Sequence, residues 1–169
     1  MRRSPRGRRV RRGWRLAFGL FVLALIVSAT AAPRTSSLRF RTDDWVTECG
    51  ASGCSITGLF QQTNLNGRRG SFALVILLGS RQLAVVGEPY PIRARVQIDK
   101  NNPAECTGPR YCIFPSREAR RAISELGAGS LVLVDVYTGK DLFRSSLSTR
   151  GYQASLAELQ AAGYAVPAI

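Results

Sequence analysis

Four cysteines are the residues whose type and spacing most clearly predict chemistry. They form two close pairs, with four residues between Cys49 and Cys54 and five between Cys106 and Cys112. Both intervals contain turn-forming residues, which bring the ends of a short segment together. In an oxidising compartment such pairs form disulfides, so we predict Cys49–Cys54 and Cys106–Cys112. A crossed pairing is the alternative, because longer closed loops stabilise a fold more.

The same cysteines fit metal or redox chemistry less well. Zinc ligands in small domains usually come in pairs separated by about two to four residues, often with histidine. This chain has no histidine, and its cysteine spacings are at or beyond that range. Thiol oxidoreductases normally use a C-x-x-C motif, which is absent. We therefore expect structural disulfides and no metal site, with a four-cysteine zinc site as the alternative.

The other residues that commonly do chemistry form no recognisable catalytic set. The lack of histidine excludes Ser-His-Asp and Cys-His catalysis. Asp43 and Asp44 are adjacent, so in a strand they point to opposite faces and cannot share a proton. Asp99, Asp135 and Asp141 are single carboxylates. We predict no catalytic residue and no cofactor; the alternative is a hydrolase-type or thiol-based periplasmic enzyme without a readable motif.

Arginines of one predicted strand and one predicted helix form a candidate binding surface. Period-two alternation over residues 92–99 exposes one face of the strand, and the helix over residues 116–126 has a basic face opposite its apolar one. Guanidinium groups suit anionic partners such as lipid headgroups, acidic polysaccharide or a protein. The alternative is two solvated faces that only maintain solubility. The five residues are Arg93, Arg95, Arg117, Arg120 and Arg121.

The basic charge of the chain belongs mostly to its first 15 residues. The formal net charge is +13, from 24 lysines and arginines and 11 acidic residues. Eight of those arginines lie in Met1–Arg15, so 16 basic residues face 11 acidic ones in the remainder, a net charge of +5. Few aromatic residues alternate with these arginines. We therefore expect no binding of nucleic acid.

The N-terminus is typical of a secretory signal peptide. A basic segment is followed by the uncharged, apolar segment Leu16–Val27 and then by small residues, with Ala29 and Ala31 two apart. We predict a signal peptide over residues 1–31, cleavage after Ala31, and export to the periplasm or the medium. The alternative is an uncleaved inner-membrane anchor facing the periplasm, although the 17 residues Leu16–Ala32 span as a helix only about 25 Å of a core of about 30 Å.

Hydrophobic patterns predict a short tether over residues 32–39 and one β-rich domain over residues 40–166. Continuous or alternating apolar segments indicate strands, and turn residues recur between them. Trp45 and Phe40 are expected in the core. We predict a mainly β fold of antiparallel sheets packed as a β-sandwich, with two short α-helices. The helices are expected over Ser116–Leu126, capped by Ser116 and ended by Gly127, and over Tyr152–Ala162; residues 100–105 are expected to form a loop.

The order of these features resembles the invasion-associated locus B proteins of alphaproteobacteria. The similarity runs from about Phe40 to Ala162 and rests on order and cysteine placement. It comprises Asp44-Trp45-Val46, the two cysteine pairs, the strand Pro91–Asp99, the helix after Ser116, residues 129–134 and Gly151-Tyr152.

This resemblance implies an exported, disulfide-bearing envelope protein, and the family is associated with host-cell invasion in some pathogens. It implies no biochemical activity. The chain differs in Tyr152, where phenylalanine is usual, in a longer gap before Gly151, and in Arg110-Tyr111 before Cys112. Together, the residues and the resemblance predict a non-catalytic binding or accessory module at the cell envelope.

Overall fold

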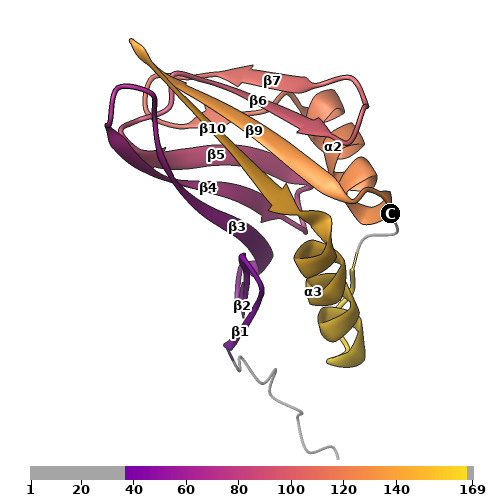
Figure 1. The fold of residues 1–169 in the computed structure, drawn as a ribbon. Helices are drawn as coiled ribbons and strands as arrows, with labels where there is room; N and C mark the ends of the chain where they lie inside the picture. Colours follow the sequence, from indigo (N-terminus) through magenta and orange to yellow (C-terminus); the bar gives the residue numbers. More distant parts are fainter. Residues whose placement is uncertain (1–36, 167–169) are drawn as a thin grey trace, which may run out of the picture. The chain divides into compact units, whose positions relative to one another are not determined.

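The computed structural model describes residues 37–166. In this range the chain forms two antiparallel sheets and two helices, which confirms the mainly β sandwich prediction (Figure 1). The six-stranded sheet has the order β1 (Leu38–Thr42), β2 (Trp45–Gly50), β3 (Gly53–Thr63), β4 (Arg69–Leu77), β5 (Gln82–Glu88), β8 (Cys112–Ile113). The four-stranded sheet has the order β10 (Asp141–Ser148), β9 (Leu131–Thr138), β6 (Arg93–Ile98), β7 (Ala104–Thr107).

The N-terminal predictions fall largely outside this range. The signal peptide expected over residues 1–31, with Ala29 and Ala31, lies outside the described residues. Strand β1 begins at Leu38, inside the range 32–39 that we expected to be a tether. The prediction was wrong at this point because alternating Leu38 and Phe40 are only half-buried, against the edge of the core.

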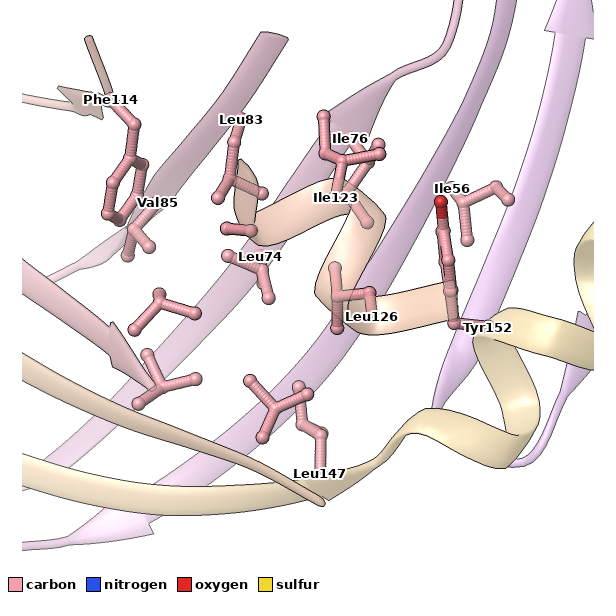
Figure 2. Packing of buried hydrophobic residues seen from close by; sticks show 14 of the residues in the cluster. Ile56, Leu74, Ile76, Leu83, Val85, Phe114, Ile123, Leu126, Leu147 and Tyr152 are labelled. Atoms are coloured by element: carbon pink, nitrogen blue, oxygen red, sulfur yellow. The ribbon is translucent and has the colours of Figure 1, made fainter. Parts of the chain in front are cut away.

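The core lies between the inner faces of the two sheets. On β4, Phe72, Leu74 and Ile76 are buried, whereas the intervening residues are more exposed. Strand β9 alternates in the same way at its start, with buried Val132 and Val134. Figure 2 shows side chains of both sheets meeting those of a helix in this core. Period-two burial is what a sheet with one covered face requires.

Helix α2 (Ser116–Ala128) fills one end of the core. Its buried residues are the four that the apolar pattern predicted: Ala119, Ala122, Ile123 and Leu126. The predicted ends were wrong. Pro115 occupies the N-cap, so Ser116 is the first helical residue and forms no side-chain cap, and the helix continues past Gly127. Gly129 instead follows the last turn, and its N–H donates to the carbonyl of Glu125 at 2.7 Å.

Helix α3 (Thr149–Ala161) packs against the β1–β2 hairpin through Trp45. It begins three residues before the predicted Tyr152, because the Ser148 hydroxyl accepts a hydrogen bond from the Arg150 N–H and caps it. The Trp45 indole donates to the Ser148 carbonyl at 2.8 Å, and its ring centroid lies 5.5 Å from that of Tyr152. A Cβ at Gly151 would lie 2.5 Å from Trp45 Cδ1, so only glycine fits this close approach. Burial raises the pKa of Tyr152 to about 12.

Strand β7 was not predicted from the sequence. Residues 100–105 were expected to be a loop, but Ala104–Thr107 pairs with β6 in antiparallel register. The segment follows Pro103, is four residues long and lies at a sheet edge, so its local pattern is weak. Pairing with β6, together with burial of Ala104 and Cys106, determines its conformation.

Trp45→Ala should lower the free energy of unfolding by about 3–5 kcal/mol, because it removes a fully buried ring and leaves a cavity. Urea unfolding monitored by circular dichroism measures this change. Tyr111→Ala is the control, since Tyr111 is an exposed aromatic residue and its loss should change stability little. A near-native midpoint for Trp45→Ala would contradict its place in the core.

Candidate functional site

All four cysteines are oxidised in the predicted local pairs. Cys49 and Cys54 are register partners in the β2–β3 hairpin, with Cα atoms 4.0 Å apart. The Cys106–Cys112 disulfide joins β7 of one sheet to β8 of the other, with Cα atoms 5.5 Å apart. No cysteine is free. Disulfides persist in oxidising compartments, so these bonds indicate an extracytoplasmic environment.

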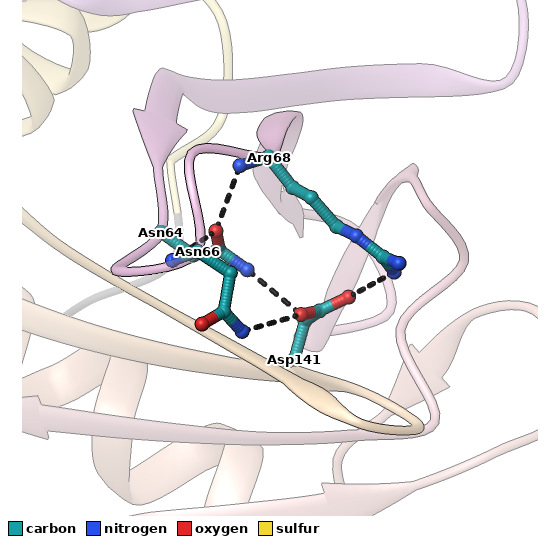
Figure 3. Close-up of polar contacts among 4 residues, drawn as sticks. All are labelled: Asn64, Asn66, Arg68 and Asp141. Atoms are coloured by element: carbon teal, nitrogen blue, oxygen red, sulfur yellow. Dashed lines mark hydrogen bonds and ion pairs between the residues drawn. The ribbon is translucent and has the colours of Figure 1, made fainter.

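The isolated carboxylates lie in structural hydrogen-bond networks. Asp141, at the start of β10, is buried and accepts from Asn64 Nδ2 at 2.8 Å and from Asn66 Nδ2 at 3.4 Å (Figure 3). The Arg68 guanidinium donates to its other oxygen at 2.8 Å. These contacts attach the β3–β4 loop of the six-stranded sheet to the four-stranded sheet. We call these four residues the Asp141 clamp.

The charge state of Asp141 depends on two opposing effects. Burial raises the pKa of the carboxyl group, but hydrogen bonds from Arg68, Asn66 and Asn64 and the charge of Arg68 favour the ionised form. The net result is a pKa below the ordinary value. Asn64 supports this geometry, because its side-chain oxygen accepts the backbone N–H groups of Asn66 at 3.0 Å and Arg68 at 2.8 Å.

The Asp99 and Asp135 carboxylates also accept hydrogen bonds from neighbouring residues of the fold. The Ser130 hydroxyl donates to Asp99 at 2.7 Å, and the N–H groups of Ser130 and Leu131 donate to the same carboxylate. These bonds lower the pKa of Asp99, the Ser130 hydroxyl most strongly. The Asp135 carboxylate accepts hydrogen bonds from Nε and Nη2 of Arg144, at 2.7 and 3.1 Å. In residues 37–166 no group of three or more Cys, Asp or Glu side chains is arranged to hold a metal.

The two strand arginines of the candidate surface lie among acidic and aromatic neighbours. Arg93 pairs with Glu105 at 2.7 Å and lies 5.3 Å above the Tyr137 ring centroid. The hydrogen bond and charge of Glu105 raise the pKa of Arg93 further. Arg95 is half-buried, and its register partners on either side are Glu105 and Asp135. No ion pair joins Arg95 to either carboxylate within residues 37–166, and its buried Nε has no hydrogen-bond partner.

The helix arginines differ in how far they are neutralised. Arg121 donates to the Pro103 carbonyl at 3.1 Å and lies 3.7 Å from Glu125. Arg117 and Arg120 are exposed and form no ion pair within the described range. Glu105 and Glu118 meet where β7 contacts α2, because the Glu105 N–H donates to the Glu118 carboxylate at 2.9 Å. Acidic groups thus lie among the five arginines, and Arg117 and Arg120 are the exposed ones that form no ion pair in the described part of the chain.

A second surface, which we did not predict from the sequence, is the central part of the outer face of the six-stranded sheet, with Arg41, Glu48 and Glu88 around it. Cross-strand register aligns uncharged side chains of five neighbouring strands there. The continuous apolar segment Ser71–Leu78 is the signal that could have indicated it, because such a segment is apolar on both faces of its strand. We call this surface the uncharged face; it comprises Val46, Thr57, Leu59, Ala73, Val75, Leu77, Ala84, Val86 and Ile113.

Comparison with known proteins identifies no family model, no curated protein and no solved structure that matches this chain. Among the described residues, neither α2 nor α3 is long and apolar enough to cross a membrane.

Asp141→Asn should lower the melting temperature at pH 7 by about 5 °C, because it removes the ionised acceptor that Arg68 and the two asparagines share. The wild-type carboxyl has a lowered pKa in the folded state. Its stabilising contribution is therefore present above the unfolded pKa of about 3.9 and is lost as the pH falls through the folded pKa.

Melting curves from pH 7 to pH 2 test this dependence. Below about pH 4 the wild-type protein should lose stability faster than Asp141→Asn does. Asp43→Asn is the control, because the exposed Asp43 side chain forms no hydrogen bond within residues 37–166. Parallel pH profiles for the wild type and Asp141→Asn would contradict the role of the clamp.

Proposed function

We propose that this protein is an exported, non-catalytic binding module of the cell envelope, similar to the invasion-associated locus B proteins. The observation that carries the proposal is the pair of disulfides, of which Cys106–Cys112 joins the edge strands of the two sheets. Cross-linked β scaffolds of this kind commonly act through surfaces held rigid by the core. The basic, apolar and small-residue segments of the N-terminus support export.

The partner in this proposal is an anionic envelope surface, bound through the exposed face of α2. Arg117 and Arg120 supply the charge, since Arg93 and Arg121 already have acidic partners. Phosphate groups of lipids and carboxylates of acidic polysaccharide share the chemistry that a guanidinium recognises. Binding by two exposed charges is weak for each copy and falls with added salt.

Export and oxidation are tested on the protein recovered from its native envelope fraction. N-terminal sequencing should begin at Ala32, and thiol titration should give no free thiols before reduction and four after it. The physical reason is that the signal peptide is removed during export and the disulfides form outside the cytoplasm. An intact Met1, or four reactive thiols without reduction, would overturn the proposal of a processed, exported protein.

The double substitution Arg117→Gln/Arg120→Gln should weaken binding to vesicles containing phosphatidylglycerol roughly thirtyfold, because each exposed charge near an anionic surface contributes about 1 kcal/mol. Co-sedimentation with vesicles at low and at physiological ionic strength measures this change. A parallel assay with an acidic polysaccharide distinguishes the two sources of anionic groups.

Lys140→Gln/Arg150→Gln is the matched control. It removes the same charge from exposed positions on other elements, so it should change binding little. Equal losses for both double variants would indicate a general charge effect and contradict a site on α2. The absence of wild-type binding to either anionic surface at low ionic strength would remove the proposed partner class.

A further inference from the structure

The two outer faces of the sandwich differ sharply in charge. The outer face of the four-stranded sheet carries a row of alternating charge in register, Arg144–Asp135–Arg95–Glu105, with Arg93 beside it. The uncharged face has no ionisable side chain at any of its nine positions. Its large apolar members are open to solvent: Leu59 and Leu77 are each 41% exposed, Val86 37% and Ile113 49%.

The size of the uncharged face is that of an interface core. It spans five strands about 4.8 Å apart and three rows of side chains about 6.8 Å apart, which gives a footprint of roughly 500 Å². Apolar patches of about 300–600 Å² on monomers are often functional. With its polar rim, the face approaches the roughly 800 Å² that each partner contributes to a stable interface.

We propose that the uncharged face is a homodimer interface, in which two copies pack their six-stranded sheets outer face to outer face. A surface of uncharged side chains can pack against a second copy of itself, and sheets pack stably about 10 Å apart through interdigitating side chains. A twofold axis makes such a contact isologous and closed, so association stops at two copies.

Charges at the rim also fit a second copy. Arg41 on β1 and Glu88 on β5 lie at opposite sides of the face, and neither forms an ion pair in the described part of the chain. Arg41 lies in the register row of Ala84, two rows along the strands from Glu88, so a twofold axis inclined to the strands is needed to place the β1 side of one copy over the β5 side of the other. Arg41 of each copy then approaches the Glu88 carboxylate of its partner, twice per dimer.

This dimer leaves the exposed face of α2, which we propose binds the anionic partner, accessible to solvent. The buried side of α2 packs in the core with inner-face residues such as Leu83 and Val85, so α2 lies on the side of the sheet opposite the uncharged face. The dimer would therefore present two copies of Arg117 and Arg120. Two weak sites joined rigidly bind a surface far more tightly than one.

Sedimentation equilibrium on the protein recovered after export tests the inference over a range of micromolar concentrations. The wild type should have twice the mass of one chain, and Leu59→Lys/Val86→Lys should weaken dimerisation by about a hundredfold, because it places charges in the centre of the interface. Leu133→Lys/Leu142→Lys is the matched control. The Leu133 and Leu142 side chains are 37% and 40% exposed on the four-stranded sheet, outside the proposed interface, so this variant should remain dimeric.

Rim charges provide a second readout that does not alter the apolar centre. Arg41→Glu should weaken the dimer about tenfold, and adding Glu88→Arg should restore it. A wild type that stays monomeric, or a Leu59→Lys/Val86→Lys variant that stays dimeric, would overturn the inference. If circular dichroism shows that the Leu59→Lys/Val86→Lys variant does not fold, the single variant Ile113→Lys on the edge strand β8 replaces it. This variant should also weaken dimerisation. Vesicle binding is not used, so this outcome is independent of the anionic partner.

Discussion

The four-stranded sheet is attached to the six-stranded sheet at both of its edge strands, and the rest of the structure depends on this double attachment. At one edge the Cys106–Cys112 disulfide joins β7 to β8. At the other edge, Asp141 at the start of β10 holds the β3–β4 loop through Asn64, Asn66 and Arg68. Between these two attachments the inner faces pack as one apolar core. A covalent bond and a buried ionic network thus hold the two layers in one arrangement.

The two outer faces then acquire different roles because their polar groups are satisfied differently. On the four-stranded sheet, arginines and carboxylates alternate across the strands and neutralise one another, as in the Arg144–Asp135 and Arg93–Glu105 pairs. Such a face is well solvated alone. The centre of the other sheet's outer face presents uncharged side chains to water, which favours burial against another surface. Self-association through that face and anion binding through α2 are therefore compatible proposals.

Much of the fold could be predicted from local patterns. The apolar segment Ser71–Leu78 and the alternating segment after Pro91 are strands, and the buried face of α2 consists of the residues that its helical spacing indicated. The helix ends were less accurate, because capping depends on backbone geometry: Pro115 displaced Ser116, and Ser148 capped a helix expected to begin later. The edge strand β7 could not be predicted from its local sequence, because its conformation depends on pairing with β6.

By itself, the sequence determined the mainly β class and most of the residues that face the core, and it favoured the local cysteine pairing, because side-chain period and turn chemistry are properties of neighbouring residues. The tertiary structure decided which surfaces are available. It placed Glu105 beside Arg93, brought Asp141 to a loop 77 residues away from it at Asn64, and aligned uncharged side chains of five strands. These relations join residues that are distant along the chain, so they follow from sheet register and packing and have no local pattern.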